Sequence, residues 1–409
     1  MIVVNNFLLS PLYSHRKILL MNIMIANSLE GVIIQIFIHN HNSCNILLTS
    51  TKESATILTR PDQTRPDQTT HVHKSLKEFL KQHDRYHILR GTKRFIIDTF
   101  YKPFYRPFDP WYHDRVHRNP SPAHKSDRIP YIIRRRYNGG LFAFFCAILG
   151  GINYADRKGY IPVVDMQNYP NTYLYDSEVG NVNAWEYYFT QPDTLTLGEA
   201  ISCRKYIISR DTSLHCHPSW AASAFYNEDG QLDYWRRICK KYIHFTQPVL
   251  DGVERELQKF AGKRVLGVSL RGTDYTGLKP HGHPVQPTIE QAISKTREVF
   301  GTGNYDSVYL ATEDRNIIAA FREAFGEKLI LSDRDAIDFD ASEGKLIIKC
   351  FDDRRENDKY LTGLEYLVSM LMLTKCSGLI TSRTNGTAGI MCLSEGFDYL
   401  YVFDLGEYD

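Results

Sequence analysis

In the second half of this 409-residue chain, short apolar runs alternate with stretches whose apolar residues have the spacing of one helix face. Each apolar run has the length of a buried strand, and the runs are residues 265–270, 307–311, 329–331 and 378–381. The stretches with helical spacing of apolar residues lie between or after these runs, at residues 288–300, 315–325, 360–374 and 385–393. Strands and helices that alternate in this order form a parallel sheet with helices on both faces. The sequence therefore predicts an α/β fold.

A similar unit precedes this half of the chain. Residues 129–133 and 160–165 have strand patterns, and a helical pattern at 141–158 lies between them. This is the length of a β–α–β crossover, so we expect two Rossmann-like lobes with a cleft between them, at residues 76–245 and 246–409. Gly139 and Gly140 start the crossover helix. They either allow a ligand close to the backbone or only form a tight turn.

The first 75 residues differ from the rest. Their apolar stretches fall short of the ~20 residues that cross a membrane. The segment Arg60-Pro-Asp-Gln-Thr64 repeats directly at residues 65–69. A tandem polar repeat is typical of disorder, so we expect residues 1–75 to be a disordered or wrongly assigned extension.

Overall charge is balanced, with 49 Lys and Arg against 47 Asp and Glu, which gives no reason to expect nucleic acid as a partner. Basic residues clearly outnumber acidic ones in residues 85–136, which could contact a membrane surface or remain solvated. The eight Cys form no C-x-x-C pair, and several lie in apolar runs. Buried free thiols indicate a reducing compartment, so we expect a cytoplasmic protein, with peripheral membrane contact as the alternative.

Polar residues follow three of the predicted strands directly. They are Arg271, Thr273 and Asp274 after the first, Thr312, Glu313 and Asp314 after the second, and Ser382, Arg383 and Thr384 after the last. Because parallel strands end at the same edge of a sheet, these groups should lie together, where nucleotides bind. The planar guanidinium group of arginine and the free amides at a helix N-terminus both bind phosphate well. Alternatively, Ser382 or Thr384 could simply cap the following helix.

The loop after Asp274 carries Lys279, His281 and His283. These side chains are candidates for acid–base catalysis or for binding a leaving group, or they are ordinary surface residues. Asp333 and Asp335 form an Asp-x-Asp pattern after another strand, and they are the candidates for a metal-dependent alternative.

The three strand ends, at residues 267–274, 308–314 and 379–384, resemble in order the three motifs of the fucosyltransferase superfamily, which includes α1,6-fucosyltransferases and protein O-fucosyltransferases. The resemblance extends over residues 129–408, and its aromatic segment at 183–189 is similar to an uncharacterised polysaccharide-biosynthesis branch. It implies a two-lobed GT-B fold and inverting transfer of fucose from GDP-fucose to a saccharide, without metal or other cofactor. The first lobe would then hold the acceptor and the second the nucleotide sugar.

The resemblance also assigns roles. Arg271 would bind the donor diphosphate and stabilise departing GDP, Asp314 would contact guanine or ribose, and Ser382, Arg383 and Thr384 would hold phosphate. Thr273 would also contact the donor, and Gly139, Gly140, Lys279 and His281 are candidates for the acceptor side.

Two departures from the family pattern keep alternatives open. Ser269 and Gly272 stand where the family has His and a second Arg, and Lys279 stands where the α1,6 enzymes have Glu. His283-Pro284 does match those enzymes. The general base is therefore His283, His281 or Asp274. A non-catalytic nucleotide-sugar-binding protein and a metal-dependent transferase using Asp333 and Asp335 remain the alternatives, and the acceptor and linkage are not specified.

Overall fold

The structure is a computed structural model that describes residues 110–135, 139–220, 230–272, 274–337 and 355–408, together with four strands near the N-terminus. By its contacts the chain divides into residues 1–109 and 110–409. In the first unit, an antiparallel sheet consists of β1 (Ile2–Leu9), β2 (Ile18–Asn27), β3 (Glu30–His39) and β4 (Ser43–Ser50), paired in that order. The expectation of a disordered or wrongly assigned start stays a prediction, and residues 51–109 lie outside the described part.

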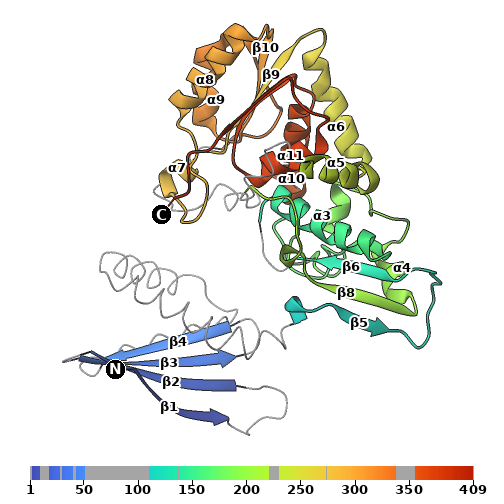
Figure 1. The fold of residues 1–409 in the computed structure, drawn as a ribbon, viewed down its shortest axis with the longest axis vertical. Coiled ribbons are helices and arrows are strands. Elements are labelled where there is room, and N and C mark those ends of the chain that lie inside the picture. The colour runs from blue at the N-terminus through green and yellow to red at the C-terminus, as the bar shows by residue number, and fades with distance from the viewer. Residues whose placement is uncertain are drawn as a thin grey trace. The chain divides into compact units, whose positions relative to one another are not determined.

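A five-stranded, fully parallel sheet is the centre of the second unit (Figure 1). Its strands are β9 (Val265–Ser269), β10 (Ser307–Ala311), β11 (Leu329–Leu331), β12 (Gly378–Ser382) and β13 (Tyr399–Phe403). They pair in the order β11-β10-β9-β12-β13. Numbered along the chain this is 3-2-1-4-5, the doubly wound order, in which the winding reverses between β9 and β12. The structure thus confirms the predicted α/β class.

Helices cover both faces of this sheet. They are α6 (Gln247–Leu257), α7 (Asp274–Leu278), α8 (Ile289–Thr302), α9 (Arg315–Phe325), α10 (Asp358–Leu373) and α11 (Asn385–Leu393). Side chains alternate along β9, so Leu266 and Val268 pack in the cluster that includes α8 and α9. On the other face, a Cβ at Gly267 would lie 3.0 Å from both Leu373 and Cys376, so α10 packs closely against this strand.

The other sheet of this unit has four strands: β5 (Arg115–Arg118), β6 (Pro130–Arg134), β7 (Ile161–Val164) and β8 (Lys205–Asp211). Their order is β5-β8-β6-β7, and β5 runs antiparallel at the edge. The long α3 (Leu141–Arg157) makes the predicted crossover from β6 to β7, and α4 (Leu197–Ser202) and α5 (Gln231–Tyr242) follow. This lobe is therefore a smaller mixed sheet rather than a second fully parallel one.

Single-turn 3₁₀ helices complete the described secondary structure: η3 (Pro110–Tyr112), η4 (Ala184–Tyr187), η5 (Thr212–Leu214), η7 (Gln258–Phe260) and η8 (Gly326–Lys328). The predicted free thiols are confirmed where the structure describes them, with five buried and Cys216 exposed. No helix in the described ranges is long and apolar enough to cross a membrane.

The two sheets are held together by helix packing. Helix α3 contacts α11 and α5. The contact is close because Gly389 of α11 lies against the ring of Phe142, and any larger residue there would overlap that ring. Both helices belong to one hydrophobic core that extends from β6 to α10. The predicted lobe boundary at 245/246 stays a prediction, since residues 110–409 pack as one compact unit.

A buried polar network beneath α3 gives a prediction for acid stability. The hydroxyl of Tyr131 donates to Asp114 Oδ1 at 2.9 Å and lies 3.2 Å from His215 Nε2. Burial, assisted by the charge of Arg210, lowers the pKa of His215 to about 4. The unfolded chain, in which histidine titrates near 6.5, binds this proton more readily. The stability contributed by neutral His215 is complete above about pH 6.5 and is lost as pH falls toward 4.

We therefore expect the urea midpoint to fall between pH 7 and pH 4.5, and to fall less in His215→Gln, which carries no titrating group. Equilibrium urea unfolding at several pH values measures both slopes. Parallel pH profiles for the two proteins would contradict this assignment of the pKa.

Candidate functional site

Two arginines lie at the point where the winding of the large sheet reverses. Strands β9 and β12 are parallel neighbours, with Leu266 opposite Gly378 and Val268 opposite Ile380. Arg271 follows β9 and Arg383 follows β12, so both start from the carboxyl edge of neighbouring parallel strands. Arg383 Nη1 forms an ion pair of 2.7 Å with Asp404. That the two guanidinium groups meet one donor stays a prediction.

Two aromatic rings connect these arginines to His283. The guanidinium carbon of Arg271 lies 4.3 Å from the ring centre of Tyr275, and the Tyr275 hydroxyl is 3.4 Å from His283 Nδ1. The His283 ring stacks toward Trp220 at 6.4 Å between centroids. Arg383 contacts Trp220 in two ways. Its guanidinium carbon lies 5.8 Å from the Trp220 ring centre, and its Nε donates to the Trp220 carbonyl at 3.2 Å.

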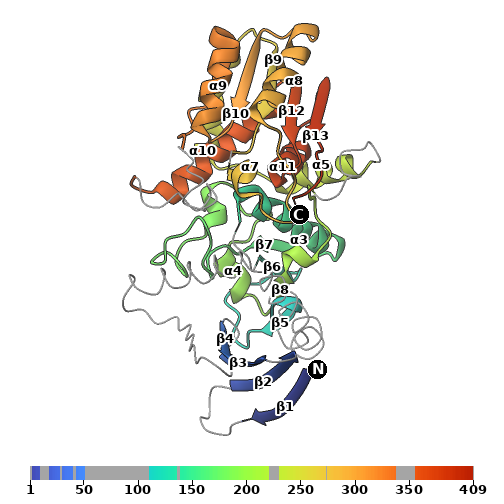
Figure 2. The ribbon, with the colours of Figure 1, turned by 90° about the vertical axis from the view of Figure 1, so that its left-hand side faces the viewer.

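The loop that carries His283 is anchored at its base. Gly282 donates to the Tyr408 carbonyl at 2.8 Å, and Tyr408 donates back to His283 O at 2.9 Å. Figure 2 shows the C-terminus beside α7, where this pairing occurs. Burial, and then the charge of Arg271, lowers the pKa of His283. His283 is therefore neutral near pH 7, which is the state that can accept a proton.

The remaining loop candidates are placed differently. Lys279 and His281 are exposed, and Lys279 has a positive φ of 43°, a conformation that costs a residue with a side chain some strain. No described contact links either of them to Arg271. Asp274 is the first residue of α7, but its side chain and all of Thr273 lie outside the described part of the chain. Of the candidates whose side chains are described, His283 is linked to Arg271 through Tyr275, and the choice of base stays a prediction.

At the end of β12, hydroxyl groups form an internal network. Thr384 is the N-cap of α11 and its Oγ1 accepts from the backbone N–H of Thr387 at 3.0 Å. Ser382, 1% exposed, donates to Oε1 of the equally buried Gln286 at 2.5 Å. The capping alternative is therefore confirmed for Thr384. The nine-residue helix α11 starts two residues after Arg383. The amides of its first turn therefore lie at the carboxyl edge of β12.

The end of β10 is fully buried. Asp314 caps α9, and its Oδ1 accepts from the N–H of Asn316 at 2.8 Å. The neighbouring Glu313 forms an ion pair of 2.8 Å with Arg334, and both side chains are at most 10% exposed. Arg334 in turn lies 4.7 Å from the ring centre of Tyr366 on α10. A hollow of about 150 Å³ adjoins this edge, lined among others by Thr312, Arg315 and Arg334.

The first-lobe candidates and the acidic pair complete the predicted set. Gly140 is the N-cap of α3 with φ of −67°, so no left-handed conformation is needed there, and Gly139 O accepts from Thr172 Oγ1 at 3.1 Å. The carboxylate of Asp333 is ion-paired with Lys259 at 2.7 Å, and the Asp335 N–H donates to Glu365 at 3.2 Å. Nowhere in the described ranges do three His, Cys, Asp or Glu side chains gather as a metal site would require.

The sequence analysis missed Trp220, the roles of Tyr275 and Tyr366, and the pair Glu313–Arg334 as parts of this site. Trp220 lies 63 residues before His283, so only the packing of the two lobes brings them together. The one signal available in the sequence was the order of residues after β9, because an arginine followed closely by a tyrosine, here Arg271 and Tyr275, permits a cation–π contact.

Comparisons with known proteins add structural likenesses only. No family model matches the chain, and no curated protein matches it in sequence. A solved structure of the NodZ fucosyltransferase from Bradyrhizobium is 14% identical with a TM-score of 0.42, and the match covers 69% of this chain and 97% of that one. NodZ α1,6-fucosyltransferase co-crystallised with GDP is also 14% identical (TM-score 0.38, covering 62% and 88%). POFUT1 in complex with GDP-fucose is 11% identical (TM-score 0.39, covering 68% and 98%).

Proposed function

We propose that this protein is a glycosyltransferase that moves a sugar, fucose in the first instance, from its GDP donor to a hydroxyl of a saccharide. The observation that supports the proposal is that Arg271 and Arg383 follow neighbouring strands at the winding reversal of a doubly wound sheet, with neutral His283 linked to Arg271 through Tyr275. Ligands of such sheets bind outside the carboxyl ends of the strands at this reversal.

The donor would place its diphosphate between the two arginines and the first amides of α11. Its nucleoside would extend toward Asp314 and the small hollow at the end of β10. The hydroxyls of Ser382 and Thr384 would act mainly by fixing the backbone that meets the phosphate, since both already bond within the protein. Thr273 would contribute from the loop after β9.

In the inverting reaction, His283 Nε2 would take the proton of the acceptor hydroxyl, and its oxygen would attack C1 of the sugar from the face opposite the phosphate. The bond from C1 to the phosphate oxygen then breaks, and both its electrons leave with GDP. Arg271 would stabilise the negative charge that grows on the leaving diphosphate. We propose that these steps need no metal ion, because guanidinium groups would neutralise the phosphates in its place.

Release of GDP from GDP-fucose in the presence of EDTA tests the proposal. We expect turnover without added metal, at a rate unchanged by chelator, with the acceptor oligosaccharide raising it further. Thermal stabilisation by GDP without turnover on any saccharide would instead favour a non-catalytic binding protein. Activity lost with EDTA and in Asp333→Ala, but retained in Arg271→Ala, would favour the metal-dependent alternative.

The cytoplasmic location and the contact of residues 85–136 with a membrane surface belong to this proposal as well. Residues 85–109 lie outside the described part of the chain.

A further inference from the structure

A second, larger hollow of about 340 Å³ lies away from the strand ends. Its lining is dominated by aromatic rings and carboxylates: Tyr173, Tyr175, Tyr187, Glu178 and Glu186 on one side, with Tyr360 of α10 on the other. These residues come from both sides of the predicted lobe boundary. The volume falls in the range of small-molecule sites in proteins.

The rings of this hollow are held in place by the carboxylate of Glu178. Tyr187 donates its hydroxyl to Glu178 Oε1 at 3.1 Å, and the N–H of Tyr175 donates to Glu178 Oε2 at 2.8 Å. The Tyr187 and Tyr360 rings meet edge to face at 5.2 Å, and Tyr188 stacks beneath Tyr360 at 6.1 Å. A site whose rings are fixed before binding loses little entropy when a ligand enters.

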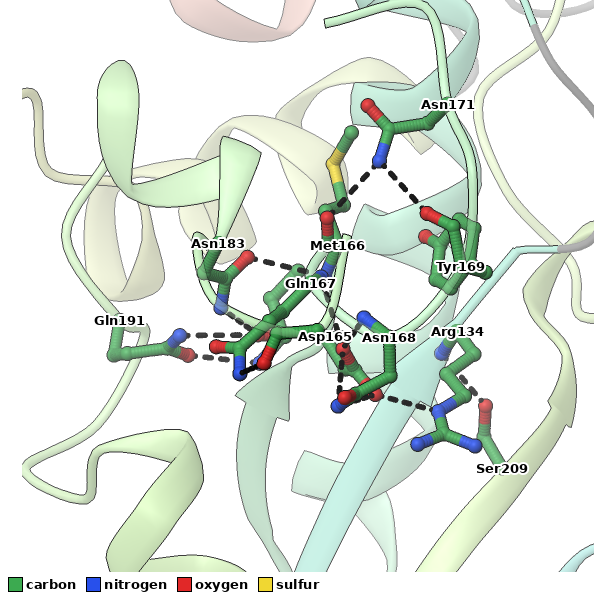
Figure 3. A network of polar contacts seen from close by, with 12 residues as sticks. Arg134, Asp165, Met166, Gln167, Asn168, Tyr169, Asn171, Asn183, Gln191 and Ser209 are labelled. Carbon is green, nitrogen blue, oxygen red and sulfur yellow. Dashed lines mark hydrogen bonds and ion pairs between the residues drawn. The ribbon is translucent and has the colours of Figure 1, made fainter. Parts of the chain in front are cut away.

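Polar side chains at the end of β7 position the other carboxylate, that of Glu186. Figure 3 shows two of them, Asn183 and Gln191. Asn183 accepts from the Met166 N–H at 3.0 Å and donates to the Val164 carbonyl at 2.8 Å, while it also caps η4. Gln191 donates to Glu186 Oε1 at 2.7 Å and to the same Val164 carbonyl at 3.0 Å. The strand end therefore fixes both Glu186 and the turn that carries Tyr187.

Aromatic faces combined with carboxylate acceptors suit a sugar ring. A pyranose presents C–H groups on its faces, which pack on aromatic rings, and hydroxyl donors at its edge, which carboxylates accept. The charged side chains among the described lining residues are both carboxylates. The nearest described cation, Lys359 Nζ, lies 4.8 Å from the Tyr175 ring centre and donates to the Leu174 carbonyl. Such a lining should favour uncharged sugars over uronic acids.

Two contacts connect the hollow to the strand-end residues. Tyr173 lines the hollow and packs against Tyr188; burial raises the pKa of its hydroxyl, while the charges of Arg334 and Arg271 lower it. Helix α10 contributes to both places, since Tyr360 lines the hollow and Tyr366 contacts Arg334. These two tyrosines are six residues apart, about 9 Å along the helix.

From these positions we infer that the hollow binds an uncharged sugar residue of the acceptor, at a place other than the hydroxyl that receives the transferred group. That this sugar belongs to the acceptor rests on the proposed function, whereas binding of a neutral saccharide at this hollow does not. Tyr360, Tyr187 and Tyr175 would supply the stacking faces, and Glu178 and Glu186 would accept the sugar hydroxyls.

Saturation-transfer NMR and calorimetry with trisaccharides, in the absence of any donor, test this inference. The probes are maltotriose, mannotriose and triacetylchitotriose as neutral sugars and trigalacturonate as the acidic one. We expect at least one neutral probe to bind, and Tyr360→Ala to weaken it about tenfold, because a stacking face is lost. Tyr360→Phe keeps the ring and should bind within about threefold of wild type. Tyr401→Ala removes a partly buried tyrosine from β13, far from the hollow, and should have no effect.

Glu186→Lys supplies an independent variant at an exposed position, and it should reduce the discrimination against trigalacturonate. Equal binding of acidic and neutral probes by wild type, no binding of any probe, or unchanged affinity in Tyr360→Ala would each overturn the inference. Saccharide binding without GDP release in wild type would overturn the proposed function while leaving the saccharide site in place.

Discussion

Arg271→Ala should lower the rate of sugar transfer by about 10²–10³-fold while leaving the fold intact. The reason is electrostatic: the guanidinium group at the end of β9 would stabilise charge that develops on the leaving diphosphate. Arg271→Lys keeps the charge but loses the planar fork, so we expect an intermediate rate. Steady-state kinetics of GDP release, with circular dichroism to check the fold, measure both effects.

Arg264 provides the matched control for this variant. It immediately precedes β9, whereas Arg271 follows it, so the two arginines flank the same strand at opposite ends. Arg264 pairs with Asp398 at 2.8 Å and lies over Tyr305 at 5.1 Å. Arg264→Ala should therefore cost some stability but leave kcat unchanged. Normal turnover by Arg271→Ala would show that the end of β9 is not the donor site.

Glu313→Ala should destabilise the protein by about 3–5 kcal/mol, because it leaves the buried charge of Arg334 without its carboxylate partner. The pair is 2.8 Å long, with side chains only 8% and 10% exposed. The double variant Glu313→Ala/Arg334→Met removes both charges, so it should be more stable than the single variant. Urea unfolding of the wild type, the two single variants and the double variant gives the coupling energy.

An exposed ion pair serves as the comparison. Lys295 and Glu298 are 2.6 Å apart on α8, but Glu298 is 63% exposed. Glu298→Ala should cost less than about 1 kcal/mol, since solvent screens such pairs. If Glu313→Ala were as mild as Glu298→Ala, the end of β10 would be hydrated rather than buried, and the ion pair would not organise this edge of the sheet.

The sequence was sufficient for features that depend on local pattern. The strands from 265 to 382 and the helices between them follow from apolar spacing, and the cap at Thr384 follows from residue type at a strand-to-helix turn. The expectation that Arg271 and Arg383 start from one edge of the sheet also needed only the rule that parallel strands end there.

Contacts between distant segments could not be predicted in this way. Trp220 reaches His283 only because the two lobes pack through α3 and α11, and Glu313 finds Arg334 only through the turn after β11. The four tyrosines of the large hollow are similarly scattered over nearly 190 positions, and Tyr187 lies in an aromatic run, residues 183–189, that resembles an ordinary core segment. The apolar pattern also did not predict that the sheet of β5 to β8 is mixed, with β5 antiparallel at its edge.

Hydrogen exchange with and without GDP tests the central claim most directly, because it locates the bound nucleotide without relying on turnover. The account predicts slower exchange at residues 270–278 after β9 and at residues 383–387 around the start of α11, with little change at the amino ends of the same strands. Protection confined to the four-stranded sheet at saturating GDP, or none at all at the end of β9, would contradict it.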